Sequence, residues 1–159
     1  MKWRWLRYGL VATPILVLVV LLVMAVWRAT HAFSPQPVRD FKTLAKWTEL
    51  KFPAGAKVID GEVRAAGTLV VVVKAELPYS QVYSFITQPA LKNAKLSRGK
   101  LNDEYGVSRS MKQYKNLSVG NPRNFVSLSR PYNSGLGLLW MLINLDDPQT
   151  AVLYLYYSD

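Results

Sequence analysis

The stretch TLVVVVKAEL at residues 68–77 decides the fold prediction, because residues 69–73 are a leucine followed by four valines. β-Branched side chains favour extended backbone, and a strand without polar alternation is typical of one that is covered on both faces. The preceding segment, residues 56–64, is separated from this stretch by the turn Ala65-Ala66-Gly67. We therefore predict a β-hairpin whose second arm is a central strand.

Three further strands are predicted in the second half of the chain, at residues 124–130, 136–145 and 151–157. The segment LGLLWMLINL at 136–145 is too short to cross a bilayer as a helix, which favours a buried strand over a re-entrant membrane segment. The sequence Asp-Asp-Pro-Gln at 146–149 is typical of a turn between the last two strands. These three strands are predicted to form an antiparallel meander.

Two short helices complete the predicted domain. Residues 38–50 place apolar side chains at helical spacing, and residues 79–87 do the same between Pro78 and Pro89. Helices that pack across such strands indicate an α+β fold. We predict an N-terminal single transmembrane helix followed by a small two-layer domain, with an antiparallel sheet of about five strands and two short helices.

The predicted transmembrane helix is the run GLVATPILVLVVLLVMAVW at residues 9–27, which contains no charge. At about 1.5 Å per residue it would span roughly 29 Å, close to the thickness of the bilayer's hydrocarbon core. Lys2, Arg4 and Arg7 precede the run and predict a cytoplasmic N-terminus. The alternative is a cleaved signal peptide with its cleavage site at Thr30-His31-Ala32.

The predicted organisation follows from this membrane segment. Residues 1–8 are a basic cytoplasmic region, 9–27 the transmembrane helix, 28–37 a spacer, and 38–159 an extracytoplasmic α+β domain. The predicted location is the inner (cytoplasmic) membrane, with a single pass and the C-terminal domain in the periplasm or outside.

The residues available for catalysis are few. The chain has no cysteine and one histidine, His31, which argues against thiol chemistry, cysteine-based metal sites and serine triads. The acidic pairs Asp103-Glu104 and Asp146-Asp147 are adjacent in sequence, so on a strand their carboxylates would point to opposite faces. We predict no catalytic residue, no metal and no cofactor.

Positive charge is concentrated in one region. The net charge is +10, and residues 92–130 hold nine cations against two anions, an excess of seven. Opposite charge on a partner would be attracted to this region. We predict that its exposed cations bind an acidic protein partner or an anionic envelope component, and no nucleic acid. The predicted partner-binding residues are Lys92, Lys95, Arg98, Lys100, Arg109, Lys112, Lys115 and Arg123.

These observations predict a membrane-anchored, non-catalytic envelope binding protein, for example a toxin-neutralising immunity or accessory protein. Its partners would be the lipid bilayer, through residues 9–27, and the anionic component. The alternative is a structural subunit of an envelope or secretion assembly. A third class, an enzyme acting on envelope polymer or lipid, would require acids or serines clustered in a cleft.

Overall fold

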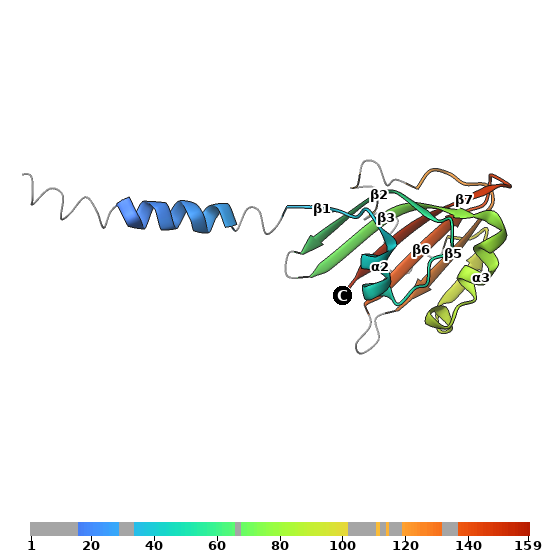
Figure 1. Cartoon of the computed structure of the whole chain (residues 1–159). Coiled ribbons are helices and arrows are strands. Elements are labelled where there is room, and N and C mark those ends of the chain that lie inside the picture. The colour runs from blue at the N-terminus through green and yellow to red at the C-terminus, as the bar shows by residue number, and fades with distance from the viewer. Residues whose placement is uncertain are drawn as a thin grey trace, which may run out of the picture. The chain divides into compact units, whose positions relative to one another are not determined.

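The computed structural model describes residues 16–28, 34–65, 68–101, 111, 114, 119–131 and 137–159. The chain divides into two compact units, Met1–Ser34 and Pro35–Asp159. The second unit contains the sheet (Figure 1).

In the first unit, residues 16–28 form a helix whose side chains are apolar from Leu16 to Trp27. None of the helices that the structure describes is long and apolar enough to cross a membrane. The prediction of a transmembrane helix over residues 9–27 is therefore corrected. The described helix begins at residue 16 and is about 20 Å long at 1.5 Å per residue, whereas a hydrocarbon core is about 30 Å thick. Residues 9–15 lie outside the described part of the chain.

The second unit is built on a seven-stranded sheet in which every neighbouring pair is antiparallel. Its spatial order is β1-β2-β3-β7-β6-β5-β4. The strands are β1 (Gln36–Pro37), β2 (Lys57–Ala65), β3 (Leu69–Pro78), β4 (Lys95–Arg98), β5 (Phe125–Arg130), β6 (Leu138–Asn144) and β7 (Thr150–Ser158).

The prediction of about five strands is wrong, and the fold is α+β with the sheet dominant. The two strands that were missed, β1 and β4, have two and four residues and lie at the two edges of the sheet. An edge strand has one neighbour and need not be apolar, so strands this short and polar leave no periodic signal in the sequence. From the sequence alone, Gln36 and Pro37 belong to the predicted spacer, and Lys95–Arg98 to a predicted exposed basic region.

The central strands agree with the sequence patterns. β2 and β3 form the predicted hairpin, and β5, β6 and β7 form the predicted meander. β3 lies between β2 and β7, and Val71, Val72 and Val73 are completely buried. Because successive side chains of a strand point to opposite faces, full burial of all three residues means that both faces are covered.

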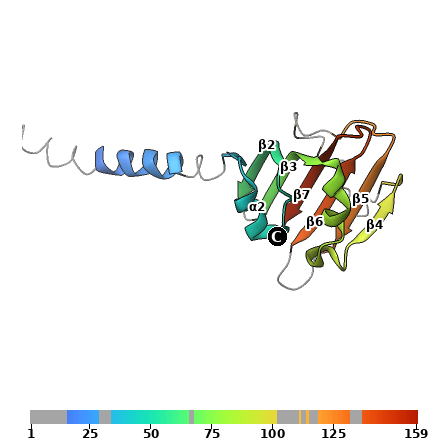
Figure 2. The same ribbon diagram turned by 45° about the vertical axis from the view of Figure 1, so that its right-hand side comes forward.

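Two short helices cover one face of the sheet, as Figures 1 and 2 show from two directions. They are α2 (Phe41–Thr48) and α3 (Val82–Ile86), and the 3-10 turns η1 (Tyr79–Gln81) and η2 (Pro89–Leu91) flank α3. Asp40 caps α2 by accepting a hydrogen bond from the Thr43 N–H at 3.1 Å. Leu44 and Phe85 enter the core on this face with Met141 and Leu155 from the sheet. We call this face the helix side.

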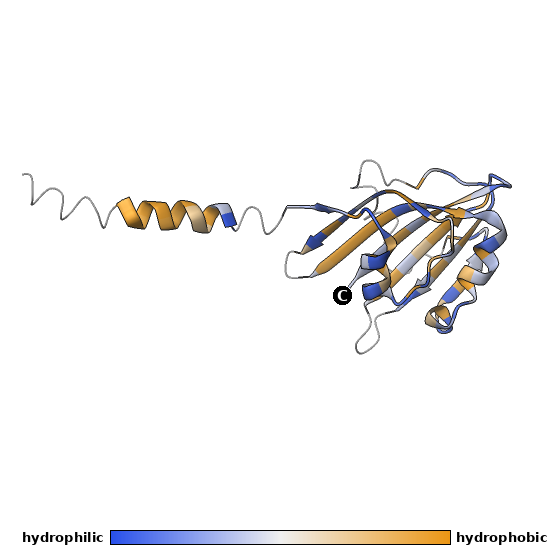
Figure 3. Ribbon diagram, viewed as in Figure 1, coloured by the Kyte–Doolittle hydropathy of each residue, from blue (hydrophilic) through white to orange (hydrophobic). Residues whose placement is uncertain are grey.

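The opposite face of the sheet carries a second apolar cluster. Val72, Trp140, Leu142 and Tyr154 are buried there, and Met111 contributes to the same cluster. Burial raises the pKa of the Tyr154 hydroxyl, because desolvation disfavours its charged form. Hydropathy colouring shows apolar residues concentrated in the sheet of the second unit and, separately, along the helix of the first (Figure 3).

Candidate functional site

Five of the eight predicted partner-binding residues lie at or beside one edge of the sheet. Lys95 and Arg98 belong to the edge strand β4, and Lys92 and Lys100 flank it. Arg123 lies just before β5, which is the only strand paired with β4 among the described residues. All five residues are exposed. We call this set the basic edge. Arg109, Lys112 and Lys115 lie outside the described residues, so the structure does not place them.

The pairing of β4 with β5 determines which way its side chains point. Arg98 lies opposite Val126, and Val126 belongs to the core on the helix side. Lys95 lies opposite Ser129, on strand positions of the other parity. The basic edge therefore presents cations on both sides of the sheet, and Arg98 is the β4 cation on the helix side.

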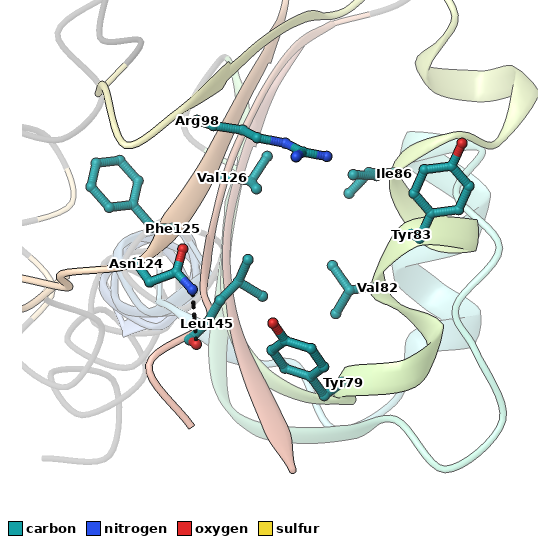
Figure 4. A pocket seen from close by; sticks show the side chains of 9 residues that line it. All are labelled: Tyr79, Val82, Tyr83, Ile86, Arg98, Asn124, Phe125, Val126 and Leu145. Carbon is teal, nitrogen blue, oxygen red and sulfur yellow. Dashed lines mark hydrogen bonds between the residues drawn. The ribbon is translucent and has the colours of Figure 1, made fainter. Parts of the chain in front are cut away.

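Arg98 borders a cleft of about 350 Å³ on the helix side of the sheet (Figure 4). One wall comes from η1 and α3, and the other from the ends of β4, β5 and β6. The first wall is formed by Tyr79, Val82, Tyr83 and Ile86. The second is formed by Arg98, Asn124, Phe125, Val126 and Leu145.

Hydrogen bonds hold the sheet wall of the cleft in place. The Asp146 carboxylate accepts hydrogen bonds from the backbone N–H of Arg123 at 3.1 Å and of Asn124 at 2.7 Å. The Leu145 N–H donates to the Asn124 carbonyl at 2.8 Å, and the Asn124 side-chain amide donates to the Leu145 carbonyl at 3.4 Å. On the helix wall, the Tyr79 N–H donates to the Gln149 carbonyl at 3.1 Å, which ties η1 to the turn between β6 and β7.

The cleft is apolar in its middle and positively charged at one end. Val82 and Ile86 face Val126 and Leu145 across it, and the Arg98 side chain extends over one end toward Ile86 (Figure 4). Among the described residues, the Arg98 guanidinium has neither a hydrogen-bond partner nor an ion-pair partner. None of the described residues that line the cleft carries a carboxylate. An anion with an apolar body would therefore complement both features.

Arg130, the ninth cation of the basic region, has a different environment. It is 5% exposed, and its Nη1 donates to the carbonyls of Ala90 at 3.1 Å and Thr48 at 3.4 Å. Burial lowers the pKa of its guanidinium, because desolvation disfavours the charged form. Arg130 thus joins β5 to α2 and η2 and does not belong to the basic edge.

The lining of the cleft offers binding groups rather than a nucleophile paired with a base. Its polar side chains are two tyrosines, an arginine and an asparagine. Across the ranges that the structure describes, no group of three or more histidines, aspartates and glutamates could hold a metal ion. Comparison with protein-family models, with curated proteins and with solved structures finds no match to this chain.

Sequence reasoning identified Arg98 but missed the cleft. The sequence pattern predicts only a helix for residues 79–87 and only a strand for residues 124–130. The cleft forms because segments far apart in the sequence lie across from each other, as do Ile86 and Val126, which are forty residues apart. No local periodicity encodes that proximity, although Tyr79 and Tyr83, which are exposed beside the buried Val82 and Ile86, are a feature that a helical projection displays.

Proposed function

We propose that this chain is a non-catalytic binding protein that associates with a lipid bilayer through residues 9–27 and recognises an anionic partner with its basic edge. The partner is an acidic protein or an anionic envelope component. The observation that carries the proposal is the gathering of five exposed cations along one sheet edge.

The charge pattern supports recognition of an anion. Residues 92–101 contain four cations and no acidic residue. Exposed charges of one sign raise the rate of encounter with an oppositely charged partner, and the effect falls as salt is added. β4 is also an edge strand of the sheet. The backbone N–H and C=O groups on the outer side of an edge strand do not pair within the sheet, so a partner chain can approach them closely.

The apolar N-terminal stretch supports association with a bilayer. Within residues 16–28, every side chain before Arg28 is apolar, so the helix has no polar face toward water. A helix that is apolar on all sides is stable when surrounded by protein or lipid. The side of the bilayer on which the domain lies stays a prediction from Lys2, Arg4 and Arg7.

The first test is photo-crosslinking in native membranes, with the photoreactive residue placed at Lys100 and, as the control, at Lys57. Lys57 is an exposed lysine on β2, toward the other edge of the sheet. We expect an acidic protein or an anionic polymer to be captured from position 100 only. Equal capture from both positions would contradict the proposal. Capture of a second copy of this chain would favour the structural-subunit alternative instead.

The second test is charge reversal, with association of the captured partner measured by surface plasmon resonance. The triple variant Lys92→Glu, Lys95→Glu, Lys100→Glu should slow association by about tenfold or more at low salt. The matched triple Lys42→Glu, Lys46→Glu, Lys57→Glu changes the net charge equally at exposed positions away from the edge. If the two triples slow association equally, net charge alone explains binding and the basic edge is not the site.

A further inference from the structure

The cleft beside α3 has features that binding of a partner at the basic edge does not require. Lys92, Lys95, Lys100 and Arg123 do not line it, whereas Arg98 does. Four aliphatic side chains line its middle, and Arg98, the one cation among the described lining residues, lies at one end (Figure 4). A macromolecule bound at the edge would use the exposed lysines without filling this space.

We propose that the cleft is a binding site for a small anionic amphiphile, with an apolar body between α3 and β5 and a carboxylate on Arg98. A guanidinium offers planar N–H donors in a fork that matches the two oxygens of a carboxylate. The described part of the chain supplies no such partner to Arg98. The carboxylate of the ligand forms the ion pair with the Arg98 guanidinium.

The size of the cleft limits the ligand. At about 30 Å³ for each water-sized group, a volume near 350 Å³ holds roughly a dozen non-hydrogen atoms. A medium-chain fatty acid or an aromatic acid has this size, whereas a two-chain phospholipid does not. Val82 and Ile86 on one wall and Val126 and Leu145 on the other would remove the ligand's apolar surface from water.

The mouth of the cleft carries exposed aromatic rings. Tyr83 is 71% exposed and Tyr79 is 38% exposed, although both belong to the wall that packs on the core through Val82 and Ile86. Tyrosines that present an apolar ring and a polar hydroxyl at the rim of a pocket are well suited to an amphiphile. Their exposure in the free chain leaves ring surface for the ligand to cover.

The test uses the full chain in phosphatidylcholine nanodiscs and measures octanoate binding by isothermal titration calorimetry, with the heat of empty nanodiscs subtracted. Octanol has the same chain without the charge and serves as the matched ligand. We expect octanoate to bind about tenfold more tightly than octanol, because a charge-assisted hydrogen bond contributes more than a neutral one. Equal affinity for both ligands would overturn the role of Arg98, and no heat above that of empty nanodiscs would overturn the site.

Three variants, one of them a control, locate the binding. Arg98→Gln should weaken octanoate binding about tenfold and leave octanol binding unchanged, whereas Lys95→Gln, on the same strand, should change neither. Tyr83→Ala should weaken both ligands several-fold, and its exposed position makes loss of folding a poor explanation. If Arg98→Gln and Lys95→Gln lower the affinity for octanoate equally, octanoate binds to surface charge in general and does not enter the cleft. These readouts do not involve the partner of the basic edge, so the two proposals fail separately.

Discussion

Two arginines on the helix side of the sheet have opposite environments. Arg98 lies opposite Val126 near the start of β5, and Arg130 is the last residue of β5, four positions beyond Val126 and on the same face. Arg130 is 5% exposed, whereas Arg98 is exposed and borders the cleft. The same residue type on one face of one strand pair is enclosed at one end and open at the other.

The difference comes from what the helices present at each end. The last residue of α2 and the middle residue of η2 supply the carbonyls that accept from Arg130. Carbonyls at a helix C-terminus lack intrahelical partners and carry partial negative charge, so they can hold a buried cation without a carboxylate. At the other end, α3 presents aliphatic and tyrosine side chains instead, and Arg98 has no acceptor among the described residues.

The largest effect is expected for Arg130→Ala. The substitution leaves a cavity and removes the donor to Thr48 and Ala90, so it should lower the free energy of unfolding of residues 35–159 by roughly 3 kcal/mol. Urea unfolding measures the change. Nε and Nη2 of Arg130 have no hydrogen-bond partner among the described residues, and both Arg130→Ala and Arg130→Met remove this buried charge. Arg130→Met should cost clearly less than Arg130→Ala, because only methionine refills the space. If Arg130→Ala lowers the free energy of unfolding by less than about 1 kcal/mol, the stability of the enclosed end does not depend on this residue.

A smaller effect is expected for Asp146→Ala at the open end. The carboxylate accepts from the backbone N–H of Asn124 in the cleft wall and from that of the adjacent Arg123, but it is exposed, so water can partly replace it. The free energy of unfolding should fall by about 1 kcal/mol. Asp146→Asn keeps one acceptor oxygen and should restore most of the loss. If both variants unfold like the native domain in urea, these hydrogen bonds do not stabilise the wall.

The smallest effect on stability is expected for Arg98→Gln. Because its guanidinium has no partner among the described residues and is exposed, the free energy of unfolding should change by no more than about 0.5 kcal/mol. Thermal unfolding of Arg98→Gln beside Arg130→Ala measures the contrast directly. If Arg98→Gln lowers the free energy of unfolding as much as Arg130→Ala does, the two ends of the sheet do not differ as the open and enclosed environments predict.

The buried strands were predictable because burial on both faces leaves a local mark. The valine run of β3 and the apolar run around Trp140 in β6 have apolar side chains on both faces, which are removed from water when the strand lies inside a covered sheet. Both strands lie there. The edge strands were not predictable on the same grounds. The side chains of Lys95–Arg98 are typical of a basic loop. The segment is a strand because its backbone pairs with β5, and the side chains do not indicate that pairing.

The chain's sequence by itself determined that the five longer strands are extended, that residues 16–27 are apolar throughout, and that the positive excess lies in residues 92–130. These are properties of neighbouring residues, and propensity and hydropathy act over such short distances. Only the tertiary structure decided that Arg130 is enclosed, that Arg98 is open, and that Ile86 and Val126 form opposite walls of one cleft. The reason is physical: the burial of a charge depends on which distant carbonyls and apolar groups the fold brings to it, and no local pattern records that.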